Sequence, residues 1–219
     1  MRQLTCILII GSIGILSACQ TSTKNTSAKD SSVQQPDHAG HMMHEATDAD
    51  DYISMVNSGS IPEDTMKGSP KRVAMATVGG THVHITYSAP GVKNRVIWGG
   101  LVPYGQVWAS GAHMATNIQV NHPVKIGDRK VEPGTYALFT IPGKTSWQVM
   151  LNTDAQQHLA DNYDSTKNVA RITLQPIWEE ESLPRLTYKV EKVNQQEGKI
   201  VLRWERLRLE IPFTSMANK

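Results

Sequence analysis

From Ser69 onward, short apolar runs alternate with turn residues, and no other feature of this chain constrains its fold as strongly. Residues 72–77 and 81–88, for example, flank a Gly79-Gly80 pair. Runs of this length that meet at a glycine turn are typical of β-hairpins. The sequence therefore predicts an all-β domain over residues 69–215, either an antiparallel β-sandwich or a partly closed barrel.

Two departures from plain alternation are predicted later in the domain. Apolar residues alternate from Ile200 to Trp204, but the phase shifts before Leu207. Because a one-residue slip would turn the buried face outward, we expect a β-bulge near Glu205-Arg206. Residues 154–161 predict a short helix, with Asn152 or Thr153 as its N-cap.

The segment 87–116 differs in kind, because it is rich in glycine, proline and tryptophan. This composition predicts a long ordered loop that crosses the sheet. Such loops often carry function, although many only cover the end of a sheet. Arg95 is a candidate for binding an anion or for pairing with a carboxylate beneath the loop. The aromatic residues Trp98, Tyr104 and Trp108 are candidates for stacking on a sugar ring or for plugging the core.

The first 18 residues predict a lipoprotein signal peptide. Arg2 precedes an apolar run that ends in Leu16-Ser17-Ala18-Cys19, which matches the lipobox of bacterial lipoproteins. The run is shorter than the roughly 20 apolar residues that cross a bilayer. We expect cleavage before Cys19, acylation of its thiol (palmitate) and attachment to a membrane. The alternative is an ordinary signal peptide that contains a cysteine. Gln20 favours the outer membrane, with the domain facing the periplasm.

Cysteine usage and charge exclude several classes of function. The chain has 2 cysteines; Cys6 would leave with the signal peptide and Cys19 would be acylated. No thiol would then remain for a disulfide, a thiolate metal site or a catalytic cysteine. The formal net charge is +2, which gives no field that would attract nucleic acid.

Residues 19–68 predict a flexible tether, because polar residues dominate and few large apolar side chains are available for burial. A short helix is expected near residues 50–56. The tether contains three histidines and two methionines within seven residues: His38, His41, Met42, Met43 and His44. Imidazole and thioether groups together favour copper. An inert linker of biased composition is the alternative interpretation.

Four long motifs resemble those of the bacterial family called domain of unknown function 2911 (DUF 2911). They are residues 87–95, residues 97–105, residues 133–142 and Asn162-Tyr163-Asp164. The resemblance spans Ser69 to Phe213. It implies a β-rich extracytoplasmic domain, often lipid-anchored, and it supplies no reaction and no catalytic residues.

Within the domain, His82 and His84 are two residues apart on a predicted strand, so both imidazoles would share one face. The resemblance implies Asp and Thr at these two positions, and Asn-Glu where His113-Met114 stands. Borderline or soft metal ligands thus occupy positions where the family carries other residues. We therefore predict a second metal site from His82, His84, His113 and Met114. Two exposed histidines on a half-wet strand are the simpler alternative.

The leading functional hypothesis is non-catalytic copper binding or sequestration by a membrane-anchored lipoprotein. A glycan- or protein-binding envelope module that uses the loop 87–116 is the alternative. A hydrolase is the third hypothesis. Ser88, Ser110, His113 and Asp128 supply suitable side chains, but no Gly-x-Ser-x-Gly motif positions a nucleophile.

Overall fold

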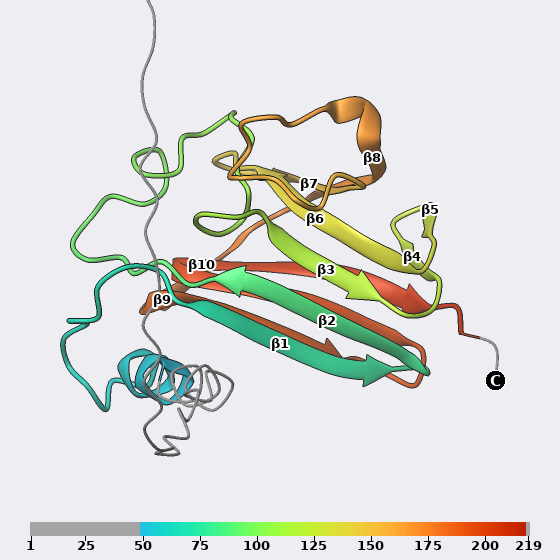
Figure 1. The fold of residues 1–219 in the computed structure, drawn as a ribbon. Helices are drawn as coiled ribbons and strands as arrows, with labels where there is room; N and C mark the ends of the chain where they lie inside the picture. Colours follow the sequence, from blue (N-terminus) through green and yellow to red (C-terminus); the bar gives the residue numbers. More distant parts are fainter. Residues whose placement is uncertain (1–48, 218–219) are drawn as a thin grey trace, which may run out of the picture. The chain divides into compact units, whose positions relative to one another are not determined.

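Two antiparallel β-sheets stacked face to face form the domain (Figure 1), and the computed structural model describes residues 49–217. The six-stranded sheet has the order β1-β2-β3-β6-β7-β8: β1 (Lys71–Val78), β2 (Thr81–Ser88), β3 (Thr116–Val120), β6 (Gly134–Ile141), β7 (Trp147–Asn152) and β8 (Asn168–Leu174). The four-stranded sheet has the order β5-β4-β10-β9: β5 (Arg129–Val131), β4 (Val124–Ile126), β10 (Glu197–Ser215) and β9 (Ile177–Lys192). The sheets are separate, so the all-β prediction is confirmed as a sandwich and not as a barrel.

One core fills the space between the sheets. Along β2, every second residue is buried, and Val83, Ile85 and Tyr87 point inward as the alternation predicts. From the other sheet, Leu202 and Trp204 of β10 enter the same cluster. The opposite side chains of β2, including both histidines, therefore lie on the outer face.

The predicted β-bulge is present in β10. Its register against β9 shifts on either side of Glu205, and Glu205 has a φ of 53°. The extra residue keeps Leu202 and Trp204 buried before the bulge and Leu207 and Leu209 buried after it. A single left-handed residue thus reconciles two apolar runs of opposite phase.

The end of β10 is bonded to the turn of the β1–β2 hairpin. The Ser215 hydroxyl donates to the Gly79 carbonyl over 2.7 Å and lies 2.7 Å from the Thr81 hydroxyl. Gly79 has a φ of 55°. A Cβ at Gly79 would also come within 2.7 Å of the Ser215 Cβ. Both the backbone conformation and the close approach therefore require glycine here.

The prediction of a helix over residues 154–161 is wrong, since this segment is irregular and then turns. Asn152 does cap the backbone, because its Oδ1 accepts from the Asp154 N–H over 2.9 Å. The chain then bonds to the long loop instead of to itself: the Ala115 N–H donates to the Gln157 carbonyl over 2.9 Å, and the Leu159 N–H donates to the His113 carbonyl over 2.7 Å. Tertiary backbone bonds have replaced the helical ones.

Residues 49–57 form a helix, which confirms the short helix expected near residues 50–56. It is part of the domain, because Ile53 is 0% exposed and Val56 is 2% exposed. The ordered domain therefore begins at least 20 positions before the predicted boundary at residue 69. Within the described residues, no helix is long and apolar enough to cross a membrane.

Candidate functional site

His82 and His84 share the outer face of β2, as predicted. Both are half-buried, and their ring centres are 6.3 Å apart. A metal bonded to an imidazole nitrogen at about 2.0–2.1 Å lies roughly 3.2 Å from the centre of that ring. Two rings can therefore share one ion when their centres are up to roughly 6.4 Å apart. The observed pair lies close to this upper limit, at which the ion and the two bonded nitrogens would be nearly in line.

The backbone and ring of His82 are held by its neighbours. The His82 N–H donates to Oδ1 of Asn121 over 2.7 Å, and Nδ1 of the ring lies 3.2 Å from the Thr77 hydroxyl. In the tautomer in which Nδ1 donates to this hydroxyl, Nε2 keeps its lone pair. Ligating histidines commonly use one ring nitrogen in this way to orient the other.

His113 does not join the histidine pair. It is exposed on the long loop with a φ of 61°, and it lines a pocket that includes neither His82 nor His84. Residues 49–217 contain no group of three or more His, Cys, Asp or Glu side chains that could hold a metal. Among these residues, His113 is therefore not grouped with His82 and His84, the other histidines of the predicted second site.

Met114 lies apart from both features. It is 45% exposed, and it lines a shallow pocket with Thr86 and Ser88 at the far end of β2. Its backbone forms an isolated bridge with His158. Sequence spacing could not foresee this arrangement, because the loop direction depends on contacts with residues more than 40 positions away.

The remaining predicted ligands, His38, His41, Met42, Met43 and His44, lie outside the described residues, as does Cys19.

The long loop 87–116 borders a pocket of about 470 Å³. Its walls are largely apolar, with Trp108 and Trp204 among them, and His113 and Asp161 contribute polar groups. Asp161 is already paired, since its Oδ2 lies 2.9 Å from Nδ1 of His158. The pocket has the size and the mixed lining of a small-molecule site.

The loop tryptophans pack mainly into the core. Trp98 lies edge-on to Trp147 at 5.0 Å, to Trp204 at 5.7 Å and to Trp108 at 5.8 Å between ring centres. These edge-to-face contacts stabilise the loop over the sheet end. Of the three aromatic candidates, only Trp108 lines the pocket. Trp98, which packs against the core, fits the alternative in which the aromatics plug the core. Tyr104 packs on Gly99, where a Cβ would come within 2.8 Å of its ring.

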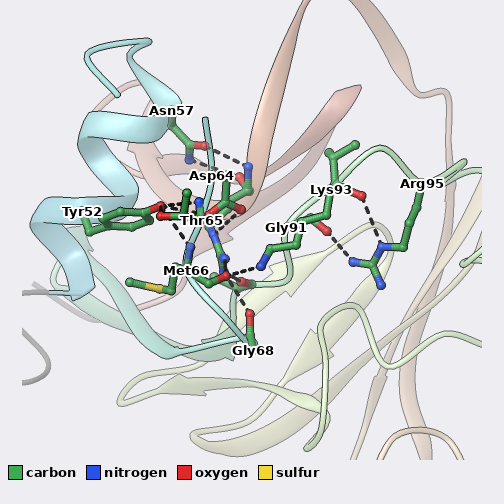
Figure 2. Close-up of polar contacts among 12 residues, drawn as sticks. Tyr52, Asn57, Asp64, Thr65, Met66, Gly68, Gly91, Lys93 and Arg95 are labelled. Carbon is green, nitrogen blue, oxygen red and sulfur yellow. Dashed lines mark hydrogen bonds and ion pairs between the residues drawn. The ribbon is translucent and has the colours of Figure 1, made fainter. Parts of the chain in front are cut away.

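Arg95 pairs with backbone carbonyls and not with the carboxylate expected beneath the loop (Figure 2). It donates to the Gly91 carbonyl over 2.5 Å and to the Val92 carbonyl over 3.2 Å. The side chain also lines the pocket. Arg95 therefore closes a turn of the loop from the pocket side.

Ser110, one of the hydrolase candidates, is not placed as a nucleophile. Ser110 is 0% exposed, and its hydroxyl lies 3.1 Å from the Thr140 hydroxyl. A nucleophile needs a general base within hydrogen-bond reach and access to substrate. Ser110 has instead a structural partner in the core.

A buried arginine, which the sequence analysis missed, connects the segment after the helix 49–57 to the rest of the domain. Nε of Arg185 lies 2.8 Å from Oδ2 of Asp64, and the two side chains are 0% and 7% exposed. Its Nη1 donates to the carbonyls of Gly68 and Ala89 over 3.1 and 3.0 Å, and its Nη2 donates to that of Met66 over 2.5 Å. The guanidinium thus combines an ion pair at Nε with three hydrogen bonds from its Nη atoms to backbone carbonyls.

Asp64, in the loop 58–68, also bonds to the helix 49–57 (Figure 2). The Tyr52 hydroxyl donates to Oδ1 of Asp64 over 3.3 Å and accepts from the Thr65 N–H over 2.8 Å. Asn57 exchanges two hydrogen bonds with the backbone of Arg185, at 2.9 and 3.1 Å. Residues 49–68 and β9 therefore form one polar junction, which is structural in character.

Comparison with known proteins places the domain in a family. Searches of curated proteins and of solved structures each found no match. One family model, described as a protein of unknown function (DUF2911), matches residues 69–213. That range takes in the β1–β2 hairpin, the long loop and both sheets. The chain therefore belongs to the DUF2911 family.

Proposed function

We propose that this protein is a non-catalytic transition-metal-binding lipoprotein of the cell envelope, and that its metal is copper. The observation that carries the proposal is the pair His82 and His84, whose ring centres are 6.3 Å apart on the outer face of β2. Imidazole is a good ligand for copper, nickel and zinc. Two half-buried rings on a rigid strand lose less freedom on binding than rings on a loop.

The His/Met sequence between His38 and His44 supports the same function. Its three imidazoles and two thioethers would capture ions near the membrane, and the strand pair would form the second site. The lipobox around Cys19 supports attachment to a membrane. In this scheme, storage or detoxification of copper is the purpose, and the protein catalyses no reaction.

Equilibrium titration of four proteins with Cu(II) and Zn(II) tests the proposal. They are the parent chain, a strand variant (H82N/H84N), a tether variant and the combination of both. In the tether variant, the three histidines and two methionines between positions 38 and 44 are replaced. We expect the parent to bind Cu(II) with submicromolar affinity and each partial variant to lose one class of site. Parent affinity no better than micromolar, or equal binding by all four proteins, would contradict the proposal.

H113N is the matched control. Asparagine tolerates the left-handed backbone at this position, and His113 lies outside the strand pair. We expect its Cu(II) affinity to equal that of the parent. Anchoring is tested separately, because Cys19→Ser should abolish incorporation of labelled palmitate and release the protein from membranes.

A second candidate function, glycan binding, is favoured by the pocket of about 470 Å³ beside the long loop. An aromatic wall at Trp108 with polar groups at His113 and Asp161 suits the apolar face and the hydroxyls of a sugar. This function predicts quenching of tryptophan fluorescence by glycan fragments, unchanged by chelators and lost in Trp108→Ala. Metal binding instead predicts that a chelator removes the bound ligand.

A further inference from the structure

We infer that Met75 supplies a third ligand to the strand pair, which makes the outer face of the β1–β2 hairpin a Cu(I) site of two imidazoles and one thioether. The inference rests on the proposed function and adds the oxidation state of the metal and a ligand that sequence spacing did not indicate. Three observations carry it: the register of β1 and β2, the exposure of Met75, and the residues that share this face.

The strand register places Met75 opposite His84. In the β1–β2 ladder, Met75 is the partner of His84 and Thr77 is the partner of His82. Met75 is thus directly across from one histidine and diagonal to the other. Side chains of directly opposite and diagonal residues are both within reach of long side chains such as methionine.

The hydrogen-bond pattern brings these side chains closer still. The Asn121 N–H donates to the His82 carbonyl over 3.4 Å, so the backbone of His82 bonds toward β3. In an antiparallel sheet, a residue whose backbone bonds toward one neighbouring strand exchanges no hydrogen bonds with the residue opposite it on the other neighbouring strand. His82 and Thr77 therefore form a non-hydrogen-bonded pair. His84, two positions further along β2, forms the same kind of pair with Met75. In such pairs the Cα atoms are only about 4.5 Å apart and the side chains are closest.

The exposure of Met75 is high for its residue type. Its exposed fraction is 57%, whereas Met150 in the core is 0% exposed. Methionine usually fills gaps in a core, and at this position its apolar surface gains little burial. Met75 is therefore largely exposed on the face that carries both imidazoles.

The chemistry of the face favours a soft ion. The outward residues of β1 to β3 include no carboxylate: they are Lys71, Val73, Met75, Thr77, His82, His84, Thr86, Ser88, Asn117 and Gln119. Hard cations such as Mg²⁺ and Ca²⁺ need carboxylate or carbonyl oxygens. Thioether ligands suit Cu(I), whereas protein ligands of Zn(II) are thiolate, imidazole and carboxylate groups. Met75 should therefore raise affinity for Cu(I) much more than for Zn(II).

Metal competition measurements on the full-length chain test this inference. The five tether ligands from His38 to His44 are replaced in every protein, so that only the hairpin site is read. Cu(I) is titrated anaerobically, under ascorbate, against a chromogenic Cu(I) chelator, and Zn(II) against a fluorescent zinc chelator. The variants are Met75→Leu, H82N/H84N and the control Met55→Leu, which changes another exposed methionine (46% exposed) outside the hairpin.

We expect Met75→Leu to weaken Cu(I) binding by about tenfold or more, because one soft ligand of three is lost, and to change Zn(II) binding by no more than about twofold. Met55→Leu should change neither metal. X-ray absorption at the copper edge should show one sulfur neighbour in the parent and none in Met75→Leu.

Two results would overturn different claims. Unchanged Cu(I) affinity and unchanged sulfur scattering in Met75→Leu would reject Met75 as a ligand and leave the proposed histidine pair intact. Unchanged Cu(I) and Zn(II) binding in H82N/H84N would reject the hairpin site as a whole, and with it the strand part of the proposed function.

Discussion

Arg185 and Asp64, 121 positions apart, form an ion pair of 2.8 Å in which the side chains are only 0% and 7% exposed. A buried charge that loses its partner is expensive, and breaking such a pair costs about 3–5 kcal/mol. Three backbone carbonyls would also lose a donor in Arg185→Met. We therefore expect this variant to lose at least about 3 kcal/mol of unfolding free energy, measured by urea denaturation.

The control for this prediction is Arg206→Met, because the Arg206 side chain is 60% exposed. Exposed pairs contribute only about 0–1 kcal/mol. A loss in Arg185→Met no larger than that in Arg206→Met would contradict the interpretation of Arg185 as an anchor.

Residues 49–68 should be indispensable to the domain, although their composition predicts a tether. A chain that begins at residue 69 lacks Asp64 and the core residues Ile53 and Val56. Each buried aliphatic side chain contributes about 1.5–3 kcal/mol, which together approach the whole stability of a small domain. We expect a chain that begins at residue 49 to unfold cooperatively and a chain that begins at residue 69 to bind hydrophobic dyes and lack near-ultraviolet circular dichroism. Equal melting temperatures would contradict this.

Tyr188 predicts a loss of stability at alkaline pH. Burial raises the pKa of its hydroxyl far above the usual 10.0, and the hydroxyl donates to the Ser110 carbonyl over 2.7 Å. Above pH 10 the unfolded chain releases this proton and the native protein keeps it. The unfolding free energy therefore falls by about 1.4 kcal/mol per pH unit from this group.

Urea titrations at pH 8, 10 and 11 check the sign and the origin of this effect. Tyr188→Phe should lose about 1 kcal/mol at pH 8, because the Ser110 carbonyl loses a donor. Between pH 10 and 11 it should lose less stability than the parent. Tyr104→Phe, which removes a tyrosine from the loop, should keep the parent's dependence. An identical slope in all three proteins would reject Tyr188 as the source.

The bulge at Glu205 predicts a particular order of stability. A residue other than glycine pays about 1–2 kcal/mol for a left-handed backbone, and a β-branched residue is the least suited to it. We expect Glu205→Gly to be at least as stable as the parent and Glu205→Val to be the least stable, by thermal unfolding. Equal stability of the glycine and valine variants would contradict the φ of 53°.

Features that depend on neighbours in the sequence could be predicted. Alternation in β2 placed Val83 and Ile85 in the core, and the change of phase before Leu207 located the bulge, because strand burial has a period of two. Arg185 could not be anticipated, since nothing near it in the chain shows that its partner is Asp64. Met75 was missed for the same reason, because its meaning depends on which residue of the neighbouring strand it faces.

The failed predictions have a related cause. Residues 154–161 have an adequate cap for a helix, yet their backbone bonds to Ala115 and His113 and not to one another in a helical pattern. His113 is grouped with the strand histidines by residue type and by its departure from the family motif, whereas the loop directs it to a separate pocket. Residue chemistry can nominate ligands, but only the register and the loop path decide which of them meet.

The hydrogen bond from Ser215 to the Gly79 turn has a consequence for biosynthesis. The hairpin that carries both strand histidines is among the first parts of the domain to be synthesised, but its turn is closed by a residue of β10, which comes after the other strands of the sandwich. β10 also pairs with both β4 and β9. A nascent chain therefore cannot complete its sandwich until β10 has been synthesised, and the turn of the β1–β2 hairpin lacks its hydrogen bond to Ser215 until then.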